Sequence, residues 1–296
     1  MRHWFEQRQQ VGALARLLMT PRPKHAPSVP GPVSTQHSAV PSRALVDAYV
    51  RFCGGDPAVY RTALPPHLFP HWSLPTWLAV ARSLPYPPTK VVNLGCQVRF
   101  EAPLLPNAKL QVRGQLVELD DDGYRAKCVL RAETSQAEQR RLQADLRVLI
   151  PYRKKPRVPG RERFEPQRVP HTARELAYHR LSSSAGAQFA QLTGDVNPIH
   201  WSRSYARAVG FPSTILHGFA SLGLAFEGLV RGLLSNDASG IAALDVRFER
   251  PLVLPAVAGV YLEGSRVFVA DAPGSRSYMT GEVELKDLLP ERGHEE

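Results

Sequence analysis

The segment DVNPIH places a carboxylate, an amide and an imidazole within six residues, at Asp195, Asn197 and His200. An imidazole exchanges protons near neutrality because its unperturbed pKa is about 6.5. A carboxylate nearby could hold one water molecule or one proton between the two groups. Pro198 restricts the backbone between them, and apolar residues alternate with the polar ones. One interpretation of the segment is therefore an acid/base pair on a stiffened turn.

Two other interpretations of these residues stay open. Asp and Asn in turns often bond to their own backbone, and a half-buried histidine is often a satisfied core residue. His217 adds a third side chain of a type that binds metals, but its spacing from Asp195 and His200 matches no strong zinc or iron pattern. We therefore expect neither a metal ion nor another cofactor.

A second segment, GFPSTILHG at 210–218, leads into a long apolar stretch and ends in Gly218. Free N–H groups at a helix N-terminus can polarise a carbonyl oxygen, and glycine permits a close approach. An acid/base pair beside such an N–H group suits chemistry at the α and β carbons of an acyl group. This second segment favours the catalytic interpretation.

The elements around these residues predict an α+β fold. A short helix over 182–194 should have a serine cap and Gly194 at its C-terminal end, and Ser202 should cap another short helix that Gly210 ends. The stretch 215–234 is apolar over most of its circumference, which is typical of a helix that other elements surround. Alternating segments predict antiparallel strands at 241–254, 256–270 and 275–288.

The two halves of the chain resemble one another. Residues 98–104 are VRFEAPL and residues 246–252 are VRFERPL, which gives six identities in seven positions. The first half repeats the predicted order, with a helix over 73–84 followed by strands at 90–104, 109–121, 123–135 and 140–152. This pattern indicates duplication of one domain.

The first half departs from the motif of the second. GGDPAVY matches Asp56 with Asp195 and puts Tyr60 in the rough place of His200, but it lacks the Asn-Pro and the histidine. The same alignment puts His71-Trp72 in the place of His217-Gly218, which removes the glycine. We expect the first half to be non-catalytic and to form a wall of the site.

The 26 contiguous residues TGDVNPIHWSRSYARAVGFPSTILHG, at 193–218, resemble the signature of the MaoC-like dehydratases, also called R-specific or type 2 enoyl-CoA hydratases. The resemblance implies a double hot-dog fold, in which each repeat wraps an antiparallel sheet around a central helix. It implies a hydro-lyase of fatty-acid metabolism that hydrates trans-2-enoyl thioesters to (3R)-3-hydroxyacyl thioesters, or catalyses the reverse. Asp195 and His200 would activate water, the Gly218 N–H would polarise the thioester carbonyl, and Asn197 would have a supporting role.

The expected division of the chain has five parts. They are a partly flexible N-terminal extension at 1–43, the non-catalytic repeat at 44–152, a basic proline-rich linker at 153–170, the catalytic repeat at 171–290 and a tail at 291–296. The substrate would be an acyl-CoA or an acyl group on a carrier protein. Because two fused repeats already form a pair, we expect a monomer or a homodimer of this unit.

Composition limits the other classes. The net charge is +10, but no nucleic-acid motif accompanies it, so we expect no nucleic-acid partner. We expect no membrane span, because no run of eighteen or more apolar residues occurs. Three scattered cysteines indicate a reducing compartment, and we expect a cytoplasmic protein rather than one with an organellar presequence. The alternative functions are an acyl thioesterase on the same fold and an inactive acyl-binding subunit of a complex.

Overall fold

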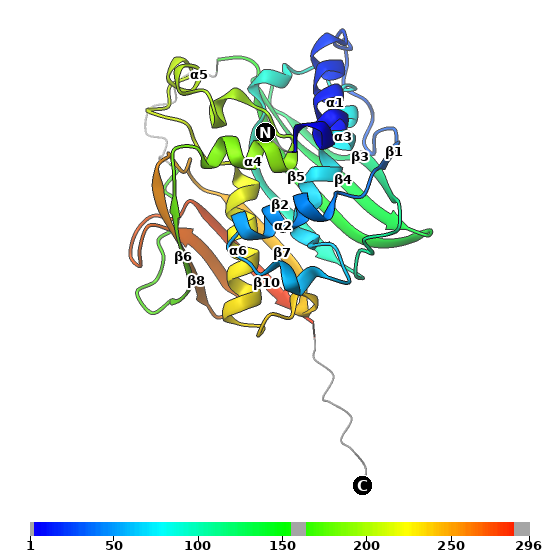
Figure 1. Cartoon of the computed structure of the whole chain (residues 1–296). Coiled ribbons are helices and arrows are strands. Elements are labelled where there is room, and N and C mark those ends of the chain that lie inside the picture. The colour runs from blue at the N-terminus through cyan, green and yellow to red at the C-terminus, as the bar shows by residue number, and fades with distance from the viewer. Residues whose placement is uncertain (1–2, 155–163, 287–296) are drawn as a thin grey trace.

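The chain folds as two halves that share one sheet, as the computed structural model shows (Figure 1). The structure describes residues 3–154 and 164–286. In each half, five antiparallel strands curve around a mostly buried helix, and shorter helices cover the open side. The expected α+β architecture with two repeats is confirmed.

The first half contains a helical N-terminus, a short edge strand, a covering helix, the central helix and a four-stranded meander. The helices are η1 (Trp4–Gln7), α1 (Arg8–Met19), α2 (Arg43–Phe52), η2 (Pro57–Tyr60), η3 (Pro66–Leu68), α3 (Phe69–Ala81) and η4 (Pro88–Lys90). The strands are β1 (Ser34–Ser38), β2 (Val92–Phe100), β3 (Leu110–Asp121), β4 (Arg125–Gln136) and β5 (Gln139–Pro151).

The second half has the same order, and as in the first half two short helices lie between its covering helix and its central helix. The helices are α4 (Ala185–Thr193), η5 (Pro198–His200), α5 (Arg203–Ala208), α6 (Gly218–Gly232) and η6 (Ala238–Gly240). The strands are β6 (Arg174–Leu181), β7 (Ile241–Phe248), β8 (Ala256–Glu263), β9 (Arg266–Ala270) and β10 (Met279–Leu285).

The halves join where β2 pairs with β7 in the middle of the sheet, whose strand order is β1-β3-β4-β5-β2-β7-β10-β9-β8-β6. Gln97 pairs directly with Asp245 across this junction. These two positions lie 148 residues apart (245 − 97), the same offset as between the two VRFE segments (246 − 98). Equivalent residues thus face one another, so a local twofold axis passes between them and relates the two halves.

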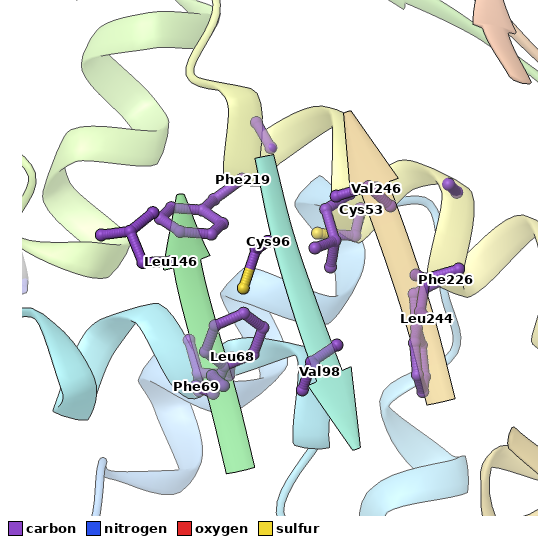
Figure 2. Packing of buried hydrophobic residues seen from close by; sticks show 14 of the residues in the cluster. Cys53, Leu68, Phe69, Cys96, Val98, Leu146, Phe219, Phe226, Leu244 and Val246 are labelled. Atoms are coloured by element: carbon purple, nitrogen blue, oxygen red, sulfur yellow. The ribbon is translucent and has the colours of Figure 1, made fainter. Parts of the chain in front are cut away.

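The core lies between the sheet and the two central helices. Figure 2 shows Cys96 and Val98 of β2 with Leu244 and Val246 of β7, all of them 0% exposed. Phe219 and Phe226 of α6 and Leu68 and Phe69 at the start of α3 belong to the same hydrophobic cluster. The apolar stretch that the sequence singled out is therefore a central helix. Because both central helices contribute to one core, the position of each depends on the other.

The predicted division of the chain stays a prediction, and parts of it lie outside the described residues. The structure places η1, α1 and β1 within the segment 1–43, and β1 pairs with β3 at the edge of the sheet. Half of the basic linker, at 155–163, and the end of the chain from 287, with the tail at 291–296, are outside the described ranges. Across 3–154 and 164–286, no helix has both the length and the apolarity to cross a membrane.

Candidate active site

The turn that carries Asp195 begins where α4 ends. Gly194 adopts a left-handed backbone conformation, with φ of +78°, and its N–H donates to the carbonyl of Ala190 at 2.9 Å. Glycine takes this conformation without steric cost, which ends the helix as the sequence predicts. Asp195 follows at once, with 38% of its side chain exposed. The predicted serine cap at the other end of α4 is wrong in detail, because Ser184 is the N-cap residue but its side chain makes no capping hydrogen bond.

Asn197 shapes the next part of the turn. Its side-chain oxygen accepts from the N–H of Ile199 at 3.3 Å and caps the single turn of η5, with Pro198 in the first position. The N–H of Asn197 points to the Asp195 carboxylate, 3.4 Å from Oδ1. Asn197 therefore holds the bend and lies beside the carboxylate, and its supporting role in catalysis stays a prediction.

His200 ends η5 and is buried, with 8% of the residue exposed. Its Nδ1 lies 2.9 Å from the carbonyl oxygen of Ile215. A carbonyl oxygen only accepts, so Nδ1 carries the proton in this hydrogen bond and Nε2 of the neutral ring carries the lone pair. Burial lowers the pKa of His200 below its ordinary value, and the nearby Asp195 only partly opposes this. His200 is thus a neutral imidazole with one nitrogen free to accept a proton.

His217 is the residue just before α6 and lies directly against His200. The two rings stack with their centroids 3.5 Å apart, and the His217 Nε2 donates to the backbone carbonyl of Asp195 at 3.0 Å. Burial, together with the proximity of His200, lowers the pKa of His217 to about 3. His217 therefore stays neutral and ties the start of α6 to the turn that carries Asp195.

Gly218 is the first residue of α6. A Cβ atom at this position would lie 2.6 to 2.7 Å from the ring of Phe248, which is closer than real Cβ contacts. Since the first N–H groups of a helix have no partner within it, they point outward and can bind an oxygen. The sequence places Gly218 correctly at the helix start, and the Phe248 ring explains why no larger residue fits there.

Asp195, His200 and His217 form one cluster. One ligand-type atom from each residue lies within 4.8 Å of the others, which is a distance that one bridging water molecule can span. Carboxylate and imidazole are also zinc ligands, but ligands bonded at about 2.1 Å lie only about 3.5 Å apart around a tetrahedral ion. The separation between His217 Nε2 and Asp195 Oδ2, 4.0 Å, exceeds this spacing, so the arrangement described suits a bridging water molecule better. The buried stacking of His217 on His200 could not be predicted from the sequence, although His217 is part of the same motif.

The first half contains an equivalent turn, but its residues match differently from the alignment expected. Gly54 has a φ of +83°, like Gly194, and Asp56 caps η2 by accepting from the Ala58 N–H at 2.9 Å. Asp56 therefore takes the part of Asn197 and not that of Asp195, so the expected match is wrong. The residue that follows Gly54, in the place of Asp195, is Gly55.

The expected match of His71-Trp72 with His217-Gly218 is also wrong, and His67-Leu68 takes that place. Tyr49 of α2 contacts the His67 ring at 5.2 Å, as Phe189 of α4 contacts the His217 ring at 4.9 Å. The Tyr60 ring lies 5.9 Å from the His67 ring, whereas the His200 ring stacks on His217 at 3.5 Å. In place of a free glycine N–H, the N–H of Leu68 donates to the carbonyl of Pro65 at 3.0 Å.

A carboxylate from the second half fills the space at Gly55. Glu227 of α6 is 1% exposed, and its carboxylate oxygens would lie 2.2 and 2.7 Å from a Cβ at Gly55. Its Oε1 lies 3.2 Å from Nε2 of His67, which is 0% exposed. The first half thus has a buried carboxylate–imidazole pair where the second half has its partly open cluster. The only sequence signal for it was one glutamate in an apolar helix.

Comparison with known proteins relates the second half of the chain to a described family. Residues 160–278 match the family described as MaoC like domain. Enoyl-CoA hydratase 2, peroxisomal, of Arabidopsis thaliana is 30% identical over 128 residues, which are 42% of this chain and 40% of that protein. 3-Hydroxyacyl-thioester dehydratase Y of Mycobacterium tuberculosis is 27% identical over 210 residues, which are 68% of this chain and 72% of that one. The match thus spans less than half of the plant protein.

The fold is shared over a longer stretch. The crystal structure of HtdX from Mycobacterium tuberculosis superposes with a TM-score of 0.68 and covers 84% of this chain and 98% of its own, at 21% identity. That likeness includes both halves and establishes the double hot-dog arrangement expected from the sequence. The chain therefore carries a MaoC-like dehydratase domain, set in a double hot-dog fold.

Proposed function

We propose that the protein is a hydro-lyase that reversibly hydrates trans-2-enoyl thioesters to (3R)-3-hydroxyacyl thioesters in fatty-acid metabolism. The observation that carries the proposal is the cluster of the Asp195 carboxylate and the neutral His200 imidazole beside the first turn of α6. The relatives whose names include enoyl-CoA hydratase and 3-hydroxyacyl-thioester dehydratase support the same reaction class.

The proposed reaction adds water across a conjugated double bond. A water molecule held between Asp195 and Nε2 of His200 loses a proton and bonds through its oxygen to the β carbon. The electrons of the double bond move toward the thioester oxygen, where the Gly218 N–H stabilises the enolate. A proton from the same pair then reaches the α carbon, and the thioester is restored. A positioned general base contributes about 10²–10⁴-fold and one oxyanion donor about 10²–10³-fold.

Product analysis with the full chain tests the proposal. Incubation with crotonyl-CoA and with a longer enoyl-CoA, followed by chromatography, gives a 3-hydroxyacyl thioester if the proposal is right. A free acid would indicate the thioesterase alternative, and no product from either substrate would favour an inactive acyl-binding subunit. The same pair of substrates measures whether longer chains are preferred.

Substitutions assign the chemistry to the cluster. Asp195→Asn and His200→Ala should each lower kcat at least about a hundredfold while the fold survives. Asp56→Asn is the matched control, because Asp56 caps the equivalent turn of the first half and has an exposed side chain. It should hydrate at the wild-type rate. Wild-type rates in both site variants would show that other residues catalyse the reaction.

The identity of the carrier and the place of action belong to the same proposal. We propose an acyl-CoA or an acyl carrier protein as the form of the substrate, and rates with matched crotonyl thioesters of each decide between them.

A cytoplasmic location is supported by the three cysteines, all of which are free and buried. Cell fractionation with an antibody against the chain tests the location, and light scattering tests whether the unit is a monomer or a homodimer.

A further inference from the structure

The N-terminal helices η1 and α1 lie against the turn that carries Asp195, although they precede the strands and helices of both repeats. In Figure 1 the start of the chain lies next to α4, and α1 lies next to α3. Ala13 and Leu17 of α1 are buried, with 6% and 3% exposed. The segment is therefore packed onto the fold at the end where α4 leads to Asp195.

Two glutamines make the contact. Gln7 and Gln10 are 0% and 1% exposed, which is unusual for polar side chains of this length. The Gln7 Nε2 donates to the carbonyl of Gln191 at 3.0 Å, in the last turn of α4. The Gln10 Nε2 donates to the carbonyl of His71 at 2.7 Å, in the first turn of α3. Burying an amide is costly unless it is hydrogen-bonded. Each Nε2 donor has a partner here and neither Oε1 has one among the described residues, so the two Nε2 bonds favour this one position of α1.

The same glutamines cover Gly194. A Cβ atom at Gly194 would lie 2.6 Å from Cβ of Gln10 and 2.8 Å from Oε1 of Gln7. His71, whose carbonyl accepts from Gln10, is buried, and its interaction with the Leu192 backbone partly opposes the lowering of its pKa by burial. The residue before Asp195 and the helical turn before it are thus enclosed by side chains from α1 and α3.

The segment is also anchored by Glu6, the residue before Gln7. The Glu6 carboxylate accepts from the N–H of Ser42 at 2.9 Å and from its hydroxyl at 2.8 Å. Burial alone would raise the pKa of Glu6, but the two hydrogen bonds from Ser42 lower it below its usual range. Because Ser42 is also the N-cap of α2, the segment is fixed to both halves.

We propose that Gln7 and Gln10 are positioning residues that hold the Asp195 carboxylate in its reactive place. They close off the outer side of the Gly194 turn, so that Asp195 cannot swing away from His200. The kinetic consequence rests on the proposed hydratase function. A shift of about 1 Å in a reacting group can lower the rate about 10²-fold, so partial loosening of the turn should lower kcat about tenfold.

Kinetics of single variants make the first test. Gln7→Ala and Gln10→Ala should each lower kcat about tenfold while KM stays within twofold. Gln9→Ala is the matched control, since Gln9 lies on the same helix and donates to the carbonyl of His37, away from the turn. It should retain the wild-type kcat. If an alanine variant does not fold, Gln10→Met, which keeps the volume but removes the donor, takes its place.

A double-mutant comparison separates positioning from general damage. If the glutamines act through Asp195, Gln10→Ala should lower the residual rate of Asp195→Asn by less than twofold. An equal tenfold loss in both backgrounds, or no loss in either, overturns the proposal.

Hydrogen exchange tests the same inference without any activity. The backbone N–H groups of Asp195 and Asn197 should exchange at least tenfold faster in Gln7→Ala and Gln10→Ala than in the wild type and in Gln9→Ala. Unchanged exchange refutes the positioning role of the two glutamines even if the enzyme is a hydratase. Faster exchange in a protein that hydrates no enoyl thioester supports the positioning role and refutes the proposed function.

Discussion

The contact between Gly218 and Phe248 yields a prediction whose size follows from the structure. An added Cβ in Gly218→Ala would lie 2.6 Å from the nearest ring atom, whereas ordinary contacts are 3.4 to 4 Å. The helix start or the ring must therefore move by about 1 Å, and since the ring packs edge-on against Phe219, the movement falls at least partly on the helix. A displacement of this size at an oxyanion donor should lower kcat about 10²-fold.

The assay is the hydration of crotonyl-CoA at saturating substrate by Gly218→Ala, Phe248→Ala and the double variant. Because Phe248→Ala removes the ring that clashes, the double variant should recover at least tenfold in kcat over Gly218→Ala. Circular dichroism and the melting temperature of each variant control for loss of fold. Wild-type turnover by Gly218→Ala would show that this N–H does not bind the thioester oxygen. A double variant as slow as Gly218→Ala would show that the Phe248 ring does not cause the loss.

Three further predictions concern protonation and the buried pair. Burial sets the pKa of His217 near 3 and of His71 near 4, below the ordinary 6.5, so the folded state binds fewer protons than the unfolded state between these values. The free energy of unfolding should therefore decrease as the pH falls below about 6.5, by about 4 kcal/mol in total at pH 5. Urea unfolding that gives the same free energy at pH 7 and at pH 5 would contradict this. Because burial also lowers the pKa of His200, the acid limb of kcat/KM should lie below pH 6.5, and a midpoint at or above 6.5 in a pH–rate profile would exclude His200 as the base. Glu227→Ala should destabilise the fold by about 1–3 kcal/mol, since it leaves the buried His67 ring without its neighbouring carboxylate, and an unchanged melting temperature would show that the pair is not needed.

Local sequence chemistry predicted much of the fold. The apolar stretch at 215–234 contains α6 (Gly218–Gly232), and Gly194 and Ser202 act at the helix ends where their backbone preferences place them. Such signals depend on a few neighbouring residues, so they can be seen without the fold. The duplication could be found because VRFEAPL and VRFERPL lie on β2 and β7, the paired strands at the junction.

The residue-by-residue match between the turn at 54–60 and the turn at 194–200 could not be predicted from local sequence signals. Asp56 and Asp195 match as letters, but the structure shows that a one-residue deletion leaves Gly55 in the place of Asp195. The carboxylate that fills that space comes from Glu227, far away in the chain. The covering of Gly194 by Gln7 and Gln10 is equally non-local, because an amide in a helix shows no preference for a distant turn.

The fused junction of β2 and β7 also bears on how the two halves could diverge. In a homodimer of identical repeats, every substitution occurs twice, once on each side of the axis. A glutamate introduced beside one turn would then also enter the symmetry-related turn, where it would compete with the working acid. In a single chain that contains both repeats, a residue can change without the same change at the symmetry-related position. Glu227 can therefore fill the space beside one turn while its counterpart on α3 remains apolar, so a single chain permits one turn to be filled and the other to stay partly open.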